Sequence, residues 1–453
     1  MKPSITILNT QGDELRGSIR PLKNNYVRIK YTLLLAGLLL AHLAFSQRTI
    51  LYCGRLIDPK SGEVSTEVSV VVSGGSIAAV QKGYLAASPG DKVVDLKGRT
   101  VLPGLIDSHV HLEEETSPNA QLRRFTASAV EDAFQSTVYA RTTLMAGFTT
   151  VRDVGGTGVN IALRNAINKG IVIGPRMYTA GKIISSTGGH ADPTHGFRDG
   201  LYAEPSFTET VADGKDACIK SVRQMYKEGA DLIKITASGG VLSLEKDGTG
   251  AQFSEEELQA IVATAKDYGM RVAAHAHGAE AMKRAIRAGV TSIEHGTFMD
   301  DETIDLFKKY GVWLVPTIIA GKSVSDSARK PGYFPPIIAG KALAIGTKIQ
   351  ATFAKAYKAG VKIAFGTDAG VYAHGKNWME FVYMTEAGMP AMEALRCATA
   401  NAADLLGVGD RLGSLEAGKL ADIIAVDGDP IKDIRAMGQV RFVMKEGVVY
   451  KSE

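Results

Sequence analysis

Residues able to bind metal ions stand at the ends of short apolar segments of this chain. His109 and His111 end the segment LPGLIDSHVHL. Alternate residues of a strand face the same way, so both imidazoles point to one side and can bind one ion. Later apolar segments contain more residues of this kind, namely Lys234, His275, Glu294, His295 and Asp368. The set predicts a metal-binding site.

Lys234 is the least ordinary member of this set. It lies between Ile233 and Ile235, and a buried lysine without a partner is costly. Taken singly, the other members have structural explanations: a histidine at a strand end is often hydrogen-bonded structure, and Asp368 before Ala-Gly is typical of a cap or turn. Because all of them stand at the same end of different strands, we interpret them as one site.

Two neighbouring features are candidates for substrate binding. His277 lies two residues after His275 and faces the same side, either as part of the site, as a structural partner of its ligands or as an ordinary core histidine. Gly239 and Gly240 have no side chains, so the backbone there can approach a ligand closely, although a simple turn explains the same residues.

Two residue pairs have a less direct connection with the site. Arg152 and Asp153 end the second strand of the series, where we expect a structural ion pair. Lys322 and Tyr333 follow the seventh strand and are candidates for a lid.

The elements that would position these residues alternate along residues 104–411. Eight apolar segments read as strands, and helical segments separate them; Ser254 and Glu257, for example, form a capping box that begins a helix. Continuously apolar strands are typical of parallel strands buried on both faces. Eight strands, each followed by a helix, are the count of a (β/α)8 TIM barrel, whose active site lies at the carboxyl ends of the strands.

Both ends of the chain instead show short β-rich runs divided by glycine turns. These runs occupy residues 47–103 and 412–453. The simplest arrangement joins them as one small β-sandwich domain, with the barrel domain inserted between them. The predicted fold class is therefore α/β, a TIM barrel with an added β-sandwich built from both chain ends.

Composition excludes several classes of protein. Hydrophobic residues make up 45% and charged residues 22%, as in ordinary globular proteins. The net charge of +4 is small for 453 residues and gives no reason to expect a nucleic-acid partner. Cys53, Cys218 and Cys397 form no C-x-x-C pair, so neither a sulfur-ligated zinc site nor a disulfide framework is expected, and we interpret them as small buried apolar residues.

The N-terminal residues read as an export signal. Residues 1–27 form a polar extension, and residues 28–46 have a basic start followed by the short apolar run TLLLAGLLLAHLAF. Small residues precede a predicted cleavage after Ser46. A single anchoring helix is the alternative, although the run is short for a membrane span. We expect an exported protein, periplasmic or secreted, with no stable membrane partner after removal of the leader.

The ordered motifs resemble the amidohydrolase superfamily, and within it the Xaa-Pro dipeptidase-like and ochratoxinase-like metal-dependent carboxypeptidases. The H-x-H motif alone is unspecific, but its order with the later motifs is specific, and the resemblance extends over residues 48–453. The resemblance implies a TIM barrel with a urease-like β-sandwich, which agrees with the strand count, and an assembly of several copies. The motifs are LPGLIDSHVHL, TGGH at 187–190, IKITASGG at 233–240, AAHAHG at 273–278, IEHG at 293–296 and FGTDAG at 365–370.

The resemblance also implies two divalent metal ions. Imidazole and carboxylate ligands suit zinc, and manganese or cobalt also fit. Two neighbouring cations repel each other, and an anionic bridge between them offsets this repulsion. The ligands that the resemblance implies are His109, His111 and Asp368 for the first ion, His275 and His295 for the second, and Lys234, carboxylated on its amine, as the bridge.

The activity implied by the resemblance is hydrolysis of an amide bond. A metal ion lowers the pKa of bound water from about 15.7 toward roughly 7. Asp368 would accept the proton of that water and return it to the leaving amine, while His190 would help to stabilise the oxyanion. The expected substrates are dipeptides or N-acyl amino acids with a free α-carboxylate, including ochratoxin-type N-acyl-phenylalanine amides. The implied substrate contacts are His190 and His277, and the exposed glycine backbone adds Gly239 as a candidate.

Three alternatives stay open. A hydrolase of cyclic amides or lactones with the same fold is the second enzyme class. A single-metal, deaminase-like site would leave Lys234 without a role. A metal-dependent binding protein is the non-enzyme alternative, and the complete ligand set together with Asp368 argues against it.

Overall fold

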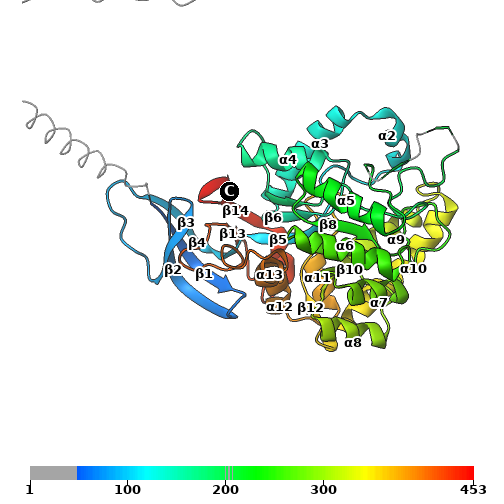
Figure 1. Ribbon diagram of the computed structural model, residues 1–453. Helices are drawn as coiled ribbons and strands as arrows, with labels where there is room; N and C mark the ends of the chain where they lie inside the picture. The colour runs from blue at the N-terminus through cyan, green and yellow to red at the C-terminus, as the bar shows by residue number, and fades with distance from the viewer. Residues whose placement is uncertain (1–47, 199, 202–204, 207) are drawn as a thin grey trace, which may run out of the picture. The chain divides into compact units, whose positions relative to one another are not determined.

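The computed structural model describes residues 48–453 with the exception of residues 199, 202–204 and 207 (Figure 1). The predicted extension, residues 1–27, and the predicted signal peptide, residues 28–46, lie outside this part of the chain. Among the described residues, no helix is long and apolar enough to cross a membrane.

Parallel strands form the middle of the chain, and all eight predicted strand segments are confirmed. They make a three-stranded sheet in the order β5-β6-β7 and a five-stranded sheet in the order β12-β11-β10-β9-β8. Parallel bridges from Ile184 to Ile235 and from Val110 to Ala369 join the outer edges of the two sheets. The strands are β5 (Leu105–Val110), β6 (Phe148–Asp153), β7 (Arg176–Thr179), β8 (Ile233–Thr236), β9 (Val272–Ala276), β10 (Ser292–His295), β11 (Trp313–Val315) and β12 (Lys362–Ile363).

Helices separate these strands and lie outside them (Figure 1). Ser254 begins α6 with the predicted capping box, in which Ser254 and Glu257 each accept the backbone N–H of the other. Gly289, in the left-handed conformation, ends α7. The helices are α2 (Ala120–Thr126), α3 (Ala129–Met145), α4 (Val159–Asn168), α5 (Lys215–Glu228), α6 (Glu255–Asp267), α7 (Ala279–Ala288), α8 (Asp301–Tyr310), α9 (Ile318–Ala328), α10 (Pro336–Lys358), α11 (Met379–Glu386), α12 (Ala391–Arg396), η1 (Cys397–Asn401) and α13 (Ala402–Leu406).

Burial of the parallel strands is complete where the predicted site residues stand. Every residue of β5, β6, β8, β9 and β10 is buried. Polar side chains in these strands therefore cannot turn to water, and each needs a partner inside the protein.

Both ends of the chain pair in one seven-stranded sheet, in the order β15-β14-β13-β4-β1-β2-β3. β4 links the two ends, because it pairs in parallel with β1 and antiparallel with β13. Arg176 of β7 connects this sheet to the parallel strands through ion pairs with Asp422 and Glu446. A two-layered sandwich, and domain boundaries at 103/104 and 411/412, stay predictions. The elements are β1 (Thr49–Asp58), β2 (Glu63–Ser73), β3 (Ser76–Lys82), β4 (Lys92–Pro103), β13 (Ile423–Val426), η2 (Ile434–Gly438), β14 (Val440–Lys445) and β15 (Val448–Ser452).

Candidate metal centre

The predicted ligands meet at the carboxyl ends of the parallel strands. One donor atom from each of His275, His277 and His295 lies within 4.8 Å of the others, and the same holds for His109, His295 and Asp368. All five residues are buried. His295 belongs to both groups, so the groups adjoin. Imidazoles with a carboxylate form a donor set that fits zinc or a similar divalent ion.

His111 joins this cluster through Asp368. The Nε2 atom of His111 lies 3.2 Å, and that of His109 3.4 Å, from Asp368 Oδ1. Burial alone would raise the pKa of Asp368, but His109 and His111 outweigh burial and lower it well below its usual range. The carboxylate is therefore held ionised, and the three residues predicted to share one ion lie together.

Each imidazole in the cluster has one ring nitrogen engaged by another partner. A carbonyl partner can only accept, so His111 and His275 must donate from the engaged nitrogen, and in the neutral ring the other nitrogen keeps a lone pair for a metal. The engaged pairs are His109 Nδ1 with Glu294 at 2.8 Å, His111 Nδ1 with Gly155 O at 2.7 Å, His275 Nε2 with Gly239 O at 3.0 Å, His277 Nδ1 with Thr297 Oγ1 at 2.9 Å and His295 Nδ1 with Thr317 Oγ1 at 2.7 Å.

Thr317 orients His295 instead of capping its own helix. It directly precedes α9, yet its side chain makes no cap hydrogen bond. Glu380 of α11 takes over this task, because its carboxylate accepts from Ile318 N at 2.9 Å and from Ile319 N at 2.7 Å. Burial raises the pKa of Glu380 to about 8, although the two N–H groups act in the opposite direction. Sequence reasoning missed both roles, since a threonine before a helix looks like an ordinary cap.

Arg152 pairs with Glu294 and not with Asp153, so the predicted Arg152–Asp153 ion pair is wrong. Its Nη2 lies 2.8 and 3.0 Å from the two Glu294 oxygens, and Glu294 also contacts His109. Burial alone would raise the pKa of Glu294, but Arg152 and His109 lower it to about 2. Neighbouring residues of a strand point to opposite sides, so Asp153 turns away and accepts from Leu112 N.

Lys234 lies in β8 with only 3% of its surface exposed. Burial lowers its pKa to about 8, while Glu294 and Asp368 act in the opposite direction. The Lys234 amine makes no hydrogen bond with any residue in the described part of the chain. Burial and the neighbouring histidines lower the pKa of His275 and of His295. The positive charge of Lys234 lowers both further. Lys234 therefore lies near members of both groups, as a buried amine with a lowered pKa.

Three residues at this edge have a left-handed backbone. The φ angles are 72° at His295, 50° at Thr317 and 61° at Asp368. Residues other than glycine seldom adopt this conformation, because Cβ crowds the backbone. Such strained residues cluster at functional sites, and here they direct two candidate ligands and one ligand partner.

His190 lies against His275, with ring centroids 4.5 Å apart in a stacked arrangement. Its Nδ1 is 2.6 Å from Ser243 Oγ and 3.7 Å from Glu245 Oε1. Burial alone would raise the pKa of Glu245, but His190 and Ser243 lower it to about 2. The structure thus places His190 beside the cluster, and its catalytic and substrate-binding roles stay predictions. It adds Ser243 and Glu245, which stand in a loop and carry no sequence signal.

Close packing explains the two glycines after β8. A Cβ on Gly240 would lie 2.1 Å from the His190 ring, and one on Gly239 would lie 2.2 Å from Asp247 O. The Gly239 carbonyl accepts from His275 Nε2. The glycines are therefore required by contacts within the chain, and a contact of Gly239 with substrate stays a prediction.

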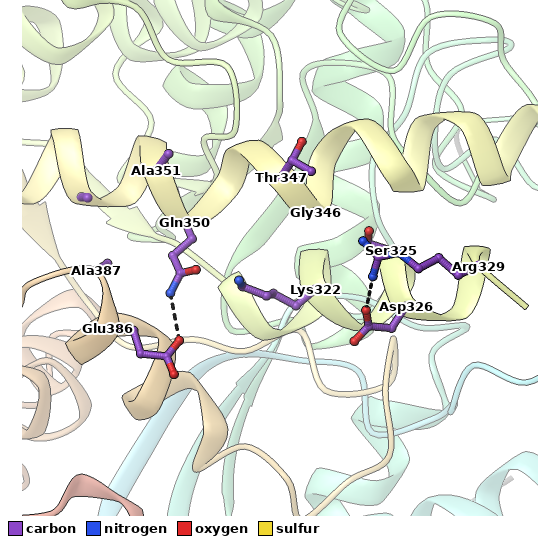
Figure 2. Close-up of a pocket in the computed structure, with 11 residues that line it drawn as sticks. Lys322, Ser325, Asp326, Arg329, Gly346, Thr347, Gln350, Ala351, Glu386 and Ala387 are labelled. Carbon is purple, nitrogen blue, oxygen red and sulfur yellow. Dashed lines mark hydrogen bonds and ion pairs between the residues drawn. The ribbon is translucent and has the colours of Figure 1, made fainter.

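A cleft of about 690 Å³ lies between α9, α10 and α11, and none of its lining residues belongs to the histidine cluster (Figure 2). Lys322 lines this cleft, with its ammonium 5.3 Å from the centre of the Tyr383 ring. Lys322 lies within α9, and its role on a lid stays a prediction. Tyr333 contacts another part of the protein. Its hydroxyl lies 3.5 Å from Thr116 O, in the loop after β5.

Comparisons with known proteins identify the family of this chain. The model of the amidohydrolase family matches residues 100–450. Ochratoxinase of Aspergillus niger is 33% identical over 434 residues, which cover 89% of this chain and 86% of the relative. The crystal structure of a Xaa-Pro dipeptidase with bound methionine is 50% identical, with a TM-score of 0.88, and covers 90% of this chain and 100% of that one. A prolidase complexed with N-methylphosphonate-L-proline is 32% identical, with a TM-score of 0.83 and the same coverage. The chain therefore belongs to the amidohydrolase family and is a hydrolase of amide bonds.

Proposed function

We propose that this chain is a binuclear metal-dependent amidohydrolase that cleaves dipeptides or N-acyl amino acids with a free C-terminal carboxylate. The observation that carries the proposal is Lys234, a buried amine with a lowered pKa near members of both ligand groups. Carboxylated on that amine, Lys234 would bridge two cations and offset their repulsion. The other ligands would be His109, His111 and Asp368 for one ion and His275 and His295 for the other.

The side chains around the cluster have distinct tasks in the proposed reaction. Two divalent ions, zinc in the first instance, would supply an acidified water and polarise the scissile carbonyl. Asp368 accepts the proton of the attacking water and returns it to the leaving amine. His190 donates to the developing oxyanion, with Ser243 and Glu245 holding its ring.

The substrate class rests on ligands found in relatives and on His277. Methionine and N-methylphosphonate-L-proline, bound in the two solved structures, both carry a free carboxylate. Burial lowers the pKa of His277 to about 3, so this imidazole is neutral. If the Thr297 hydroxyl donates to Nδ1, Nε2 of His277 carries the proton and donates it to a carboxylate. A third ligand beside His275 and His295 is the other role open to His277.

Other features of the protein also stay proposals. We propose that β5 to β12 close into a (β/α)8 barrel, because the two bridges join both pairs of outer edges. The β-sandwich, the export signal with a periplasmic or secreted destination, and assembly into a homo-oligomer rest on the sequence.

A metal analysis combined with a substrate panel tests the function. Protein expressed with bicarbonate should contain two divalent ions per chain and hydrolyse dipeptides or N-acyl amino acids. Asp368→Asn keeps an oxygen donor, so it should retain metal and lose turnover. One ion per chain would overturn the binuclear site, and full activity of Asp368→Asn would overturn the role of Asp368. Turnover restricted to cyclic amides or lactones would establish the alternative function.

A further inference from the structure

Helix α3 carries an apolar stripe that no described residue covers. Val130, Phe134 and Val138 are 63%, 72% and 55% exposed, and their spacing of four residues places them in one row. The opposite face is buried, through Ser136, Ala140, Thr143 and Leu144. Helix α3 and the neighbouring α2 lie at the outer edge of the helices that surround the parallel strands β5 to β12 (Figure 1). Large apolar side chains gathered on one exposed face mark an interaction surface.

Residues of opposite charge lie at the two ends of this stripe. Glu131 stands at its N-terminal end and Arg141 at its C-terminal end, and both are exposed. Glu131 uses Oε2 to accept from the Ser128 backbone and hydroxyl. Arg141 forms no ion pair with any residue in the described part of the chain. An acid at one end and a base at the other make the face complementary to a copy of itself that runs in the opposite direction.

We propose that this face of α3 is a twofold interface between two copies of this chain. A twofold contact uses the same patch on both subunits, so the patch must be complementary to itself. An axis near Phe134 and Val138 makes the two helices antiparallel and packs the apolar stripes together. It also brings Glu131 of one copy toward Arg141 of the partner subunit. The interface is independent of the proposed reaction, since none of these residues belongs to the histidine cluster.

The first test uses a single cysteine close to the axis. In the full chain, a short bis-maleimide should cross-link Phe134→Cys into a covalent dimer, because an axis between Phe134 and Val138 brings residue 134 within about 10 Å of its own copy. The native cysteines are buried and free, so they contribute no background. Tyr310→Cys is the matched control, since Tyr310 is 47% exposed at the end of α8 and should give no dimer. Absence of a covalent Phe134→Cys dimer at concentrations where the protein self-associates would overturn the twofold contact.

The second test identifies the occupant of the stripe. Protection of the Phe134→Cys thiol from a maleimide should increase with protein concentration and disappear on dilution. In mass photometry, Phe134→Asp should lower the mass of the assembly at least twofold, whereas Tyr310→Asp should leave it unchanged. Protection that does not depend on concentration would show that the same chain covers the stripe. That result, or a wild-type protein that is monomeric at all concentrations, would overturn the proposal.

Discussion

The Thr317 hydroxyl lies 2.7 Å from His295 Nδ1, while Glu380 binds the first two N–H groups of the helix that Thr317 precedes. A threonine in this position normally accepts from N–H groups of the first turn. Its hydroxyl is free to hold His295 because a carboxylate from another helix serves those groups. The start of α9 is thus part of the candidate metal centre.

Removal of the Thr317 hydroxyl should weaken metal binding. Partners that orient a ligand typically contribute about 10- to 100-fold in metal affinity, so we expect a loss of that size in Thr317→Val. Thr317→Ser keeps the hydroxyl and should bind like the wild type. Competition titrations with a chelator measure the effect. Equal affinities of the Val and Ser variants would contradict the role of the hydroxyl.

Glu380 should make stability depend on pH. Burial raises its pKa from 4.5 to about 8, so the folded protein favours the protonated carboxyl. The stabilisation from the protonated Glu380 is fully present below the pKa of Glu380 in the unfolded chain. It is lost as the pH rises from there through about 8, because in this range the folded protein keeps a proton on Glu380 that the unfolded chain releases. The free energy of unfolding should therefore fall with rising pH more steeply in the wild type than in Glu380→Gln. Urea unfolding of the metal-free proteins at a series of pH values gives both slopes, and parallel slopes would refute the prediction.

Lys234 should be required for metal retention. Lys234→Ala removes the amine that would carry the bridging carboxylate, so metal content and activity should fall together. Added propionate should restore part of both, because a free carboxylate can occupy the vacated space. Lys322→Ala serves as the control. Lys322 lies in the cleft between α9 and α10, outside the histidine cluster, so this variant should keep its metal. If Lys234→Ala retained two ions per chain without propionate, the bridge would be disproved.

The close contact between Gly240 and His190 should make alanine harmful at position 240. The added Cβ would lie 2.1 Å from the ring, so the ring or the loop must move. If His190 stabilises the oxyanion, kcat/KM should fall by about 10²-fold or more while metal content stays constant. Gly340→Ala is the control, because a Cβ there meets no atom within 4 Å. Wild-type kcat/KM in Gly240→Ala would argue against a role for His190.

The strands, and the place where the candidate ligands stand, could be predicted from the sequence because both depend on short-range rules. Apolar segments mark buried strands, alternation sets the side that His109 and His111 face, and parallel strands bring their carboxyl ends to one edge. The partners of the ligands depend on contacts between distant segments. Arg152 finds Glu294 across 142 residues of sequence, where reasoning along one strand indicated Asp153.

Residues in loops and helices escaped prediction for a related reason. Ser243 and Glu245 hold His190 from a loop, and Glu380 caps α9 from another helix. Hydroxyl and acidic residues are common in such segments. Only the packing of α9 against α11 and of the loop against His190 distinguishes these three from solvent-facing neighbours.

The left-handed backbone at His295, Thr317 and Asp368 has a consequence for descent. Glycine adopts this conformation freely, whereas other residues lose roughly 1 kcal/mol or more each. A descendant that no longer hydrolysed its substrate would gain stability by drifting to glycine or asparagine at these positions. Among sequences that share the fold, retention of histidine, threonine and aspartate at positions 295, 317 and 368 should therefore distinguish active enzymes from copies that have lost the activity.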